Sequence, residues 1–418
     1  MRVRGATTAL LCAAGFATSG LTARGQGAPP PSRPAPAASP SPRAPAAAPA
    51  ADFERESAAA AAAKKAKRLP EAVTHYRAAL KVKPSWNEGR WDLGSVLYEM
   101  DRYAEARTEF RAVVAGEPKH ALALAMWGLC DFQLKDYKDA LQHLGQARLL
   151  GVPNPDVASV ADYHAAILLI RAESYEGAYD ILRDFANLGK DTPGIIEAIG
   201  LTQLRLPYLP SEVPDEQREM IVMAGRAGYL MAQNRRSAAA RSAFEELASR
   251  FPTVPNVHYA YGTCLLPEKP DLALEEYQRE LKASPNHYLA MLRIAVEQLK
   301  RSNPQAALPY AQKARELAPN FFASRLVLGR VLLETGDVEH AQAELEKAAQ
   351  IAPESPEVYF SLARVYQKQG REAAAKEMRS KFLVLQKRQQ ERTKGADSAG
   401  GIVPPDSPDP STDKGAKP

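Results

Sequence analysis

The chain has 418 residues, of which 45% are hydrophobic and 25% are charged, so most of its length can bury a core. Only three cysteines are present, which excludes a disulfide-rich scaffold and a cysteine-based zinc framework. The formal charge of +5 comes from the first 50 residues, which hold five arginines and no acid; the nearly neutral remainder argues against nucleic-acid binding.

Residues 1–25 have the order of a secretory signal peptide. Met1–Arg4 carries two positive charges, Ala6–Leu21 is apolar, and small residues around Ala23 and Gly25 offer cleavage points. The apolar run is shorter than the roughly 20 residues that span a bilayer. We therefore expect cleavage and export, to the periplasm or the outside of the cell. An uncleaved N-terminal anchor, which would be the chain's one link to a membrane, and lipidation are the alternatives.

Two stretches lack the large apolar residues that a folded segment needs. Residues 26–50 consist almost entirely of Pro, Ala, Ser and Arg, and residues 393–418 are mostly Gly, Pro, Asp, Ser and Lys. Such compositions cannot offset the entropy of ordering the chain. We predict a disordered linker at 26–50 and a disordered tail at 393–418.

Between these stretches the sequence repeats with a period close to 34 residues. Prolines recur at 33- to 35-residue intervals, apart from one gap of three intervals: Pro84, Pro118, Pro153, Pro252, Pro285, Pro319 and Pro353. Four periods contain a large apolar residue followed by glycine: Leu93-Gly94, Trp127-Gly128, Tyr261-Gly262 and Leu328-Gly329. An alanine follows eleven or twelve residues after each glycine, and a second large apolar residue four after that. This period fits two short antiparallel helices and two turns.

The pattern resembles the tetratricopeptide repeat family, in which W-x2-L-G-x2-Y is followed by A-x3-F and P. The resemblance covers about residues 53–392 and implies an all-α fold, a right-handed superhelical solenoid of stacked helix-turn-helix repeats. Its small residues would lie where the two helices of a repeat cross, so Gly329 and Ala341 should meet. Residues 53–84, with a polyalanine first helix, would be a capping repeat.

Residues 207–214 interrupt the repeats with three prolines, which cannot lie inside a helix. Gly194–Leu206 resembles a first helix, but no second helix follows it before helix resumes at Asp215. We therefore predict two sub-arrays, 51–206 and 215–392 with a capping helix, joined by a Pro-rich break. We expect the break to be the most protease-sensitive site of the folded region. The alternative is a loop that plugs the binding groove.

The sequence contains no motif for catalysis or metal binding. It has no His-Glu-x-x-His, no histidine pair at helical spacing and no Gly-x-Ser-x-Gly elbow. Ala224–Gly228 is glycine-rich but lies in a helical stretch and lacks the Lys-Ser or Lys-Thr of a phosphate loop. Cys130 and Cys264 lie four periods apart, too far for a disulfide in a solenoid. We expect no enzymatic activity, no catalytic residue, no metal and no cofactor.

In the family that the sequence resembles, the first helices line a concave groove that binds protein or peptide partners. Carried over by position, nine side chains would line this groove: Trp91, Tyr98, Phe132, Tyr163, Tyr229, Tyr259, Arg330, Phe360 and Arg364. The alternative is that many of them belong to the core between repeats. Family members that bind chaperone tails hold a C-terminal carboxylate with Lys and Asn. Trp91 and Ser95 stand at those positions here, which disfavours that function.

The resemblance therefore implies an exported, non-enzymatic scaffold that binds a partner polypeptide in its concave groove. An alternative is a subunit of an envelope secretion, pilus or outer-membrane assembly complex, because the Pro-rich linker would give reach from the membrane. A third hypothesis, an enzyme that selects substrates through its repeats, has no catalytic motif to support it.

Overall fold

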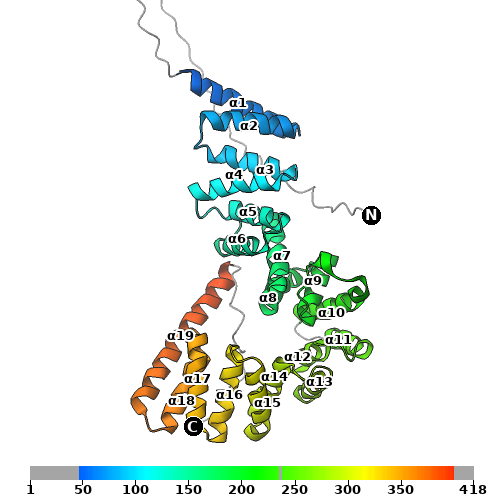
Figure 1. Ribbon diagram of the computed structural model, residues 1–418, viewed down its shortest axis with the longest axis vertical. Helices are drawn as coiled ribbons and strands as arrows, with labels where there is room; N and C mark the ends of the chain where they lie inside the picture. The colour runs from blue at the N-terminus through cyan, green and yellow to red at the C-terminus, as the bar shows by residue number, and fades with distance from the viewer. Residues whose placement is uncertain (1–46, 235–237, 400–418) are drawn as a thin grey trace, which may run out of the picture. The chain divides into compact units, whose positions relative to one another are not determined.

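The computed structural model of the chain describes residues 47–234 and 238–399. These residues form 19 α-helices and one short 3₁₀ helix and contain no strand, which confirms the all-α solenoid of helix pairs (Figure 1). The expected signal peptide, most of the expected linker and residues 400–418 lie outside the described residues. None of the described helices is both long enough and apolar enough to cross a membrane.

The described residues divide into two compact units, and the division falls between residues 158 and 159, within α7 (Pro155–Arg171). The first unit contains α1 (Ala47–Lys65), α2 (Leu69–Val82), α3 (Asn87–Glu99), α4 (Tyr103–Gly116), α5 (Ala121–Gln133) and α6 (Tyr137–Leu150). The second unit contains α8 (Tyr175–Asn187), α9 (Pro193–Leu204), η1 (Pro210–Glu212), α10 (Asp215–Asn234), α11 (Ala238–Arg250), α12 (Val257–Leu265), α13 (Pro270–Ala283), α14 (Tyr288–Lys300), α15 (Pro304–Leu317), α16 (Phe322–Thr335), α17 (Val338–Ile351), α18 (Pro356–Lys368) and α19 (Glu372–Ala399).

The first and last helices are longer than the sequence pattern indicates. α1 begins at Ala47, inside the expected linker, and α19 continues to Ala399, beyond the expected start of the tail at residue 393. Both extensions continue a helix that is already formed, and alanine has the highest helix propensity of all residues. Composition alone therefore places both boundaries several residues inside the helices.

Glycines at the eighth position of the repeat allow the two helices of a pair to cross closely. A β-carbon built on each would lie 2.6–2.9 Å from a side-chain carbon of the second helix: Gly94 from Phe110, Gly128 from Leu144, Gly262 from Tyr277 and Gly329 from Leu345. Ordinary β-carbons do not approach other heavy atoms so closely, so a larger residue at these positions would force the neighbouring side chain to shift. At Gly329 the Ala341 carbonyl oxygen is also near, at 3.3 Å, but Leu345 is the closer neighbour.

The turn between the two helices of a pair repeats as regularly as the crossing. One residue in the left-handed conformation ends the first helix of six pairs, at 34-residue spacing within each run: Lys67, Asp101 and Lys135, then Ser302, Gly336 and Gly370. The amide that follows donates to a carbonyl group in the last turn of that helix, as from Arg102 to Leu97 and from Asn303 to Gln298. The short turn makes each pair antiparallel.

α9 and α10 form a helix pair that the repeat pattern did not predict. A β-carbon on Gly200 would overlap the carbonyl oxygen of Ile221, and one on Gly225 would overlap that of Ile196. α10 therefore packs closely along α9 on the other side of the proline-rich loop, a contact that the sequence analysis did not expect. The three prolines belong to a loop inserted between the two helices of this pair, inside the second unit.

Side chains of the 207–214 loop and of α7 hold this loop in place. Leu209 and Val213 are 2% and 5% exposed, and Tyr208 is half-buried. The Glu212 carboxylate accepts a hydrogen bond from the Leu209 amide, at 3.0 Å, and pairs with Arg171 of α7 at 2.5 Å. These contacts oppose opening of the loop, and its expected protease sensitivity stays a prediction.

A buried polar contact holds the start of α12. His258 Nδ1 lies 2.6 Å from a Glu276 carboxylate oxygen, and its Nε2 lies 3.0 Å from the Pro252 carbonyl oxygen. Both neighbours are acceptors, so both ring nitrogens can donate only in the protonated imidazole. The hydrogen bond to Glu276, more than any other contact, raises the pKa of His258 above its ordinary value, although burial opposes the shift.

Gly225→Ala should reduce the free energy of unfolding by about 3 kcal/mol or more, the upper end of the range that is typical of overpacking. The reason is that the new methyl group meets backbone, which cannot rotate away. Gly145→Ala is the control, because a β-carbon inside α6 meets nothing within 4 Å there. It should raise stability by about 0.5–1 kcal/mol through helix propensity. Denaturant unfolding measures the change in the free energy of unfolding for each variant. Equal changes in the two variants would contradict the close crossing of α9 and α10.

Glu212→Ala should increase the rate of proteolytic cleavage within residues 207–214 by about fivefold. The substitution removes the hydrogen bond to the Leu209 amide and the pair with Arg171. Because the carboxylate is partly exposed, we expect the loss to be about 1 kcal/mol. Glu216→Ala, an exposed neighbour at the start of α10, should leave the rate unchanged. Limited proteolysis with mass spectrometry measures both rates, and identical cleavage of the two variants would refute the role of Glu212.

His258→Gln should destabilise the protein more at pH 5.5 than at pH 9. Because the pKa of His258 is raised in the folded state, its contribution to stability is complete below the unfolded-state pKa of about 6.5. This contribution is lost as pH rises through the folded-state pKa. At pH 5.5 we expect a loss of about 1.5–3 kcal/mol, the range for hydrogen bonds to charged groups. His340→Gln is the control, because that side chain is 76% exposed. A loss independent of pH would show that His258 is neutral in the fold.

Candidate functional site

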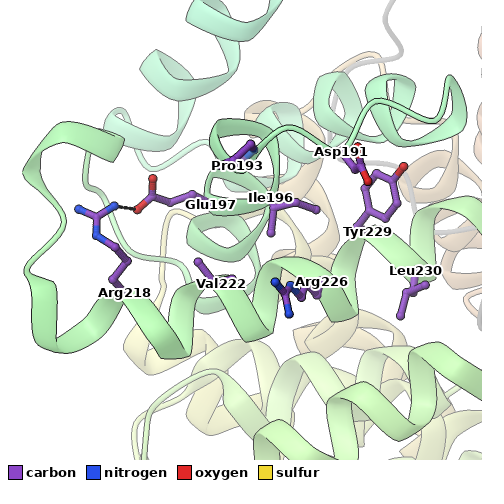
Figure 2. A pocket seen from close by; sticks show the side chains of 9 residues that line it. All are labelled: Asp191, Pro193, Ile196, Glu197, Arg218, Val222, Arg226, Tyr229 and Leu230. Atoms are coloured by element: carbon purple, nitrogen blue, oxygen red, sulfur yellow. Dashed lines mark hydrogen bonds and ion pairs between the residues drawn. The ribbon is translucent and has the colours of Figure 1, made fainter. Parts of the chain in front are cut away.

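A cavity of about 490 Å³ lies between α9 and α10 in the second unit (Figure 2). The residues that line it come from the turn before α9, from α9 itself and from one face of α10: Asp191, Pro193, Ile196, Glu197, Arg218, Val222, Arg226, Tyr229 and Leu230. Its size is in the range of sites that hold small molecules or short peptide segments.

The close helix crossing produces the floor of this cavity. Ile196 lies beside Gly225 at the crossing, and Val222 follows Ile221, whose carbonyl oxygen faces Gly200. On α10 the lining residues Arg218, Val222, Arg226 and Tyr229 recur at intervals of four, four and three, so they share one face of the helix. The result is an apolar floor with charged side chains around it.

One ion pair closes an end of the cavity. Arg218 donates to the carboxylate of Glu197 (Figure 2). Its other terminal nitrogen donates to the Val213 carbonyl oxygen at 3.2 Å. Glu197 is 8% exposed, and burial raises the pKa of its carboxyl group while Arg218 opposes the shift. Arg218 therefore neutralises a buried charge and ties the cavity to the 207–214 loop.

Two of the aromatic residues expected in the groove lie next to α9: Tyr229 of α10 and Tyr163 of α7. Tyr229 lines the cavity, and its hydroxyl oxygen accepts a hydrogen bond from Gln233 at 3.0 Å. Burial, and then the nearby Asp191 carboxylate, raise the pKa of Tyr229. A β-carbon on Gly194 would lie 2.9 Å from the Tyr163 hydroxyl oxygen, so Tyr163 contacts the first turn of α9.

Trp91 and Tyr259, also expected in the groove, share one structural role in the two units. The Trp91 ring stacks on His120 at 5.7 Å, and the Tyr259 ring packs on His287 at 4.9 Å. Each histidine accepts the backbone N–H three residues later with Nδ1, and so caps the first helix of the next repeat. Both aromatic rings therefore pack between repeats.

A buried network lies beneath Tyr259. The Glu280 carboxylate is fully buried and accepts the backbone N–H groups of Asn256, at 2.8 Å, and Tyr259, at 3.1 Å. The Asn256 side chain donates to the Leu204 carbonyl oxygen at 3.0 Å and accepts from His287 at 2.9 Å. This network links the end of α9 to α12, α13 and α14.

The remaining expected groove residues do not reach the cavity. In the first unit, Tyr98 packs edge-on against Tyr103 and Phe132 packs against Tyr137, each within its own repeat. In the second unit three residues lie on α16 and α18: Arg330, Phe360 and Arg364. Arg364 pairs with Glu334 at 2.7 Å, and Phe360 is 41% exposed and contacts Phe382.

The sequence pattern missed four charged residues of the cavity: Asp191, Glu197, Arg218 and Arg226. The one signal was Ala224–Gly228, whose glycines permit the close crossing instead of binding phosphate. Across the described part of the chain, no three His, Cys, Asp or Glu side chains are arranged to hold a metal ion. The cavity offers apolar contact, a phenol and charges of both signs.

Known families and structures show similarity to this chain. Models described as tetratricopeptide repeat match residues 57–115, 91–149, 226–288, 267–321 and 298–348, and one described as TPR repeat matches 329–370. Together these matches cover more than half of the chain. The sequence has no match among curated proteins.

Two solved structures illustrate the similarity. MamA (41-end) from Desulfovibrio magneticus RS-1 is 20% identical, with a TM-score of 0.38 over 41% of this chain and 97% of that one. YrrB, described as "a TPR protein with an unusual peptide-binding site", is 20% identical, with a TM-score of 0.36 over 41% of this chain and 89% of that one. On the family matches, the chain belongs to the tetratricopeptide repeat family and is a scaffold of the kind that such repeats build for interactions between proteins.

Proposed function

We propose that this protein is an exported, non-enzymatic scaffold that binds a partner polypeptide in its concave groove. The observation that carries the proposal is the cavity between α9 and α10, which combines an apolar floor, the Tyr229 ring and charged groups. Aromatic anchors in such recesses contribute much of the free energy of binding. The cavity is therefore the expected centre of the contact.

A polypeptide suits this surface better than an isolated small molecule. Neighbouring first helices of a solenoid present extended binding surfaces. A segment that places one side chain in the cavity can therefore continue across further repeats. Arg330 and the Arg364–Glu334 pair on α16 and α18 offer polar contacts for such a continuation.

Export is proposed from the basic, apolar and small-residue order of residues 1–25. The alternative, a subunit of an envelope secretion, pilus or outer-membrane complex, uses the same export route. It differs in its partners, because a subunit of an assembly has a fixed set of neighbours on several faces.

A photo-crosslinking amino acid at Leu230, in the full-length chain produced by its own organism, should capture one polypeptide. Tyr229→Ala should reduce the crosslinked product roughly thirtyfold, because a buried aromatic anchor contributes about 2 kcal/mol or more. Tyr229→Phe keeps the ring and should retain the product. Mass spectrometry of the crosslinked peptides should place the contact in one extended segment of the partner.

The same crosslinker at Leu188, which is 73% exposed and does not line the cavity, is the control position. Equal capture of one partner at both positions would contradict binding centred on the cavity. Several neighbours captured at both positions would favour the assembly complex. N-terminal sequencing of the mature protein should begin near residue 24 or 26, and an intact Met1 in the mature pool would disprove cleaved export.

A further inference from the structure

The two arginines that line the cavity differ in their partners. Arg218 pairs with the buried Glu197 and also donates to the Val213 carbonyl oxygen. Arg226 is exposed and makes no ion pair or hydrogen bond with any residue that the structure describes. One guanidinium of the cavity is thus committed to the fold, and the other is available to a ligand.

Arg226 lies on the same face of α10 as the apolar floor. It follows Val222 by four residues and precedes Tyr229 by three, and Figure 2 shows it below Ile196, between Val222 and Tyr229. A guanidinium offers five N–H donors in one plane and binds carboxylates through paired hydrogen bonds. A carboxylate bound to Arg226 would lie beside any apolar side chain of the ligand that packs on the apolar floor of the cavity.

The other end of the cavity has the opposite charge. Asp191 lies beside Tyr229 in Figure 2, and it makes no ion pair with the described residues. Its charge raises the pKa of the Tyr229 phenol, second to burial. A second acidic group at this end would be repelled, so the cavity distinguishes a single carboxylate near Arg226 from a run of acidic residues.

We propose that the partner segment places an apolar side chain on the Ile196–Val222 floor and a single adjacent carboxylate on Arg226. This inference rests on the proposed function, because it specifies the chemistry of the polypeptide that the cavity binds. The opposite charges of Arg226 and Asp191 also give the bound segment a direction.

Three synthetic peptides that differ at one residue test the proposal: acetyl-Ala-Leu-Leu-Glu-Ala-amide and its Gln and Lys analogues. Titrated into the full-length chain, the Glu peptide should bind about tenfold more tightly than the Gln peptide, as expected for one charge-assisted contact at a partly exposed site. Arg226→Gln should lower the affinity for the Glu peptide to that for the Gln peptide. Arg111→Gln, which changes an exposed arginine of α4 that makes no ion pair with the described residues, should alter neither affinity.

Charge reversal separates a lost contact from a damaged fold. Arg226→Glu should make the Lys peptide the preferred ligand, a gain that an unfolded variant cannot show. Equal affinities for the Glu and Gln peptides, with both reduced in Tyr229→Ala, would overturn the acidic preference and leave the proposed function intact. Binding of none of the three peptides would count against both, and the crosslinking experiment at Leu230 then decides the proposed function separately.

Discussion

The backbone contact between α9 and α10 is the interaction on which the cavity depends. Gly200 and Gly225 let each helix touch the other's carbonyl oxygens, so no side chain fits between the two helices at the crossing. Side chains next to the contact, such as Ile196 and Val222, therefore turn aside and form a floor. Larger residues at the two glycines would separate the helices, and the floor would become ordinary inter-helix packing.

The regular part of the fold could be predicted because its contacts are local in sequence. Gly262 and Tyr277 belong to one repeat, and their spacing recurs in other repeats, so the pattern specifies the crossing. The α9–α10 crossing joins two helices across a proline-rich loop and has no counterpart elsewhere in the period. A pattern search has no spacing by which to recognise it, and the glycines of Ala224–Gly228 suggest only a phosphate loop that lacks its Lys-Ser or Lys-Thr.

The candidate groove residues show a different limit. Repeat position predicts which helix face carries Trp91 or Tyr259, but it does not predict which neighbour covers that face. The covering residues, His120 and His287, come from the start of the next repeat and are fixed there because they cap a helix. Trp91 and Tyr259 therefore pack between repeats, whereas Tyr229 lines the cavity, and contact of any of the three with a ligand stays a prediction.

The network around Asn256 explains how the cavity can keep an exposed arginine. The Asn256 side chain holds the carbonyl end of α9, and the buried Glu280 holds the backbone at Asn256. Arg218 neutralises Glu197, whose buried charge would otherwise cost several kcal/mol. With α9 fixed by these contacts, Arg226 is not needed to stabilise the pair. Its side chain makes no ion pair with the described residues, and it is the group that we propose binds a carboxylate of the partner.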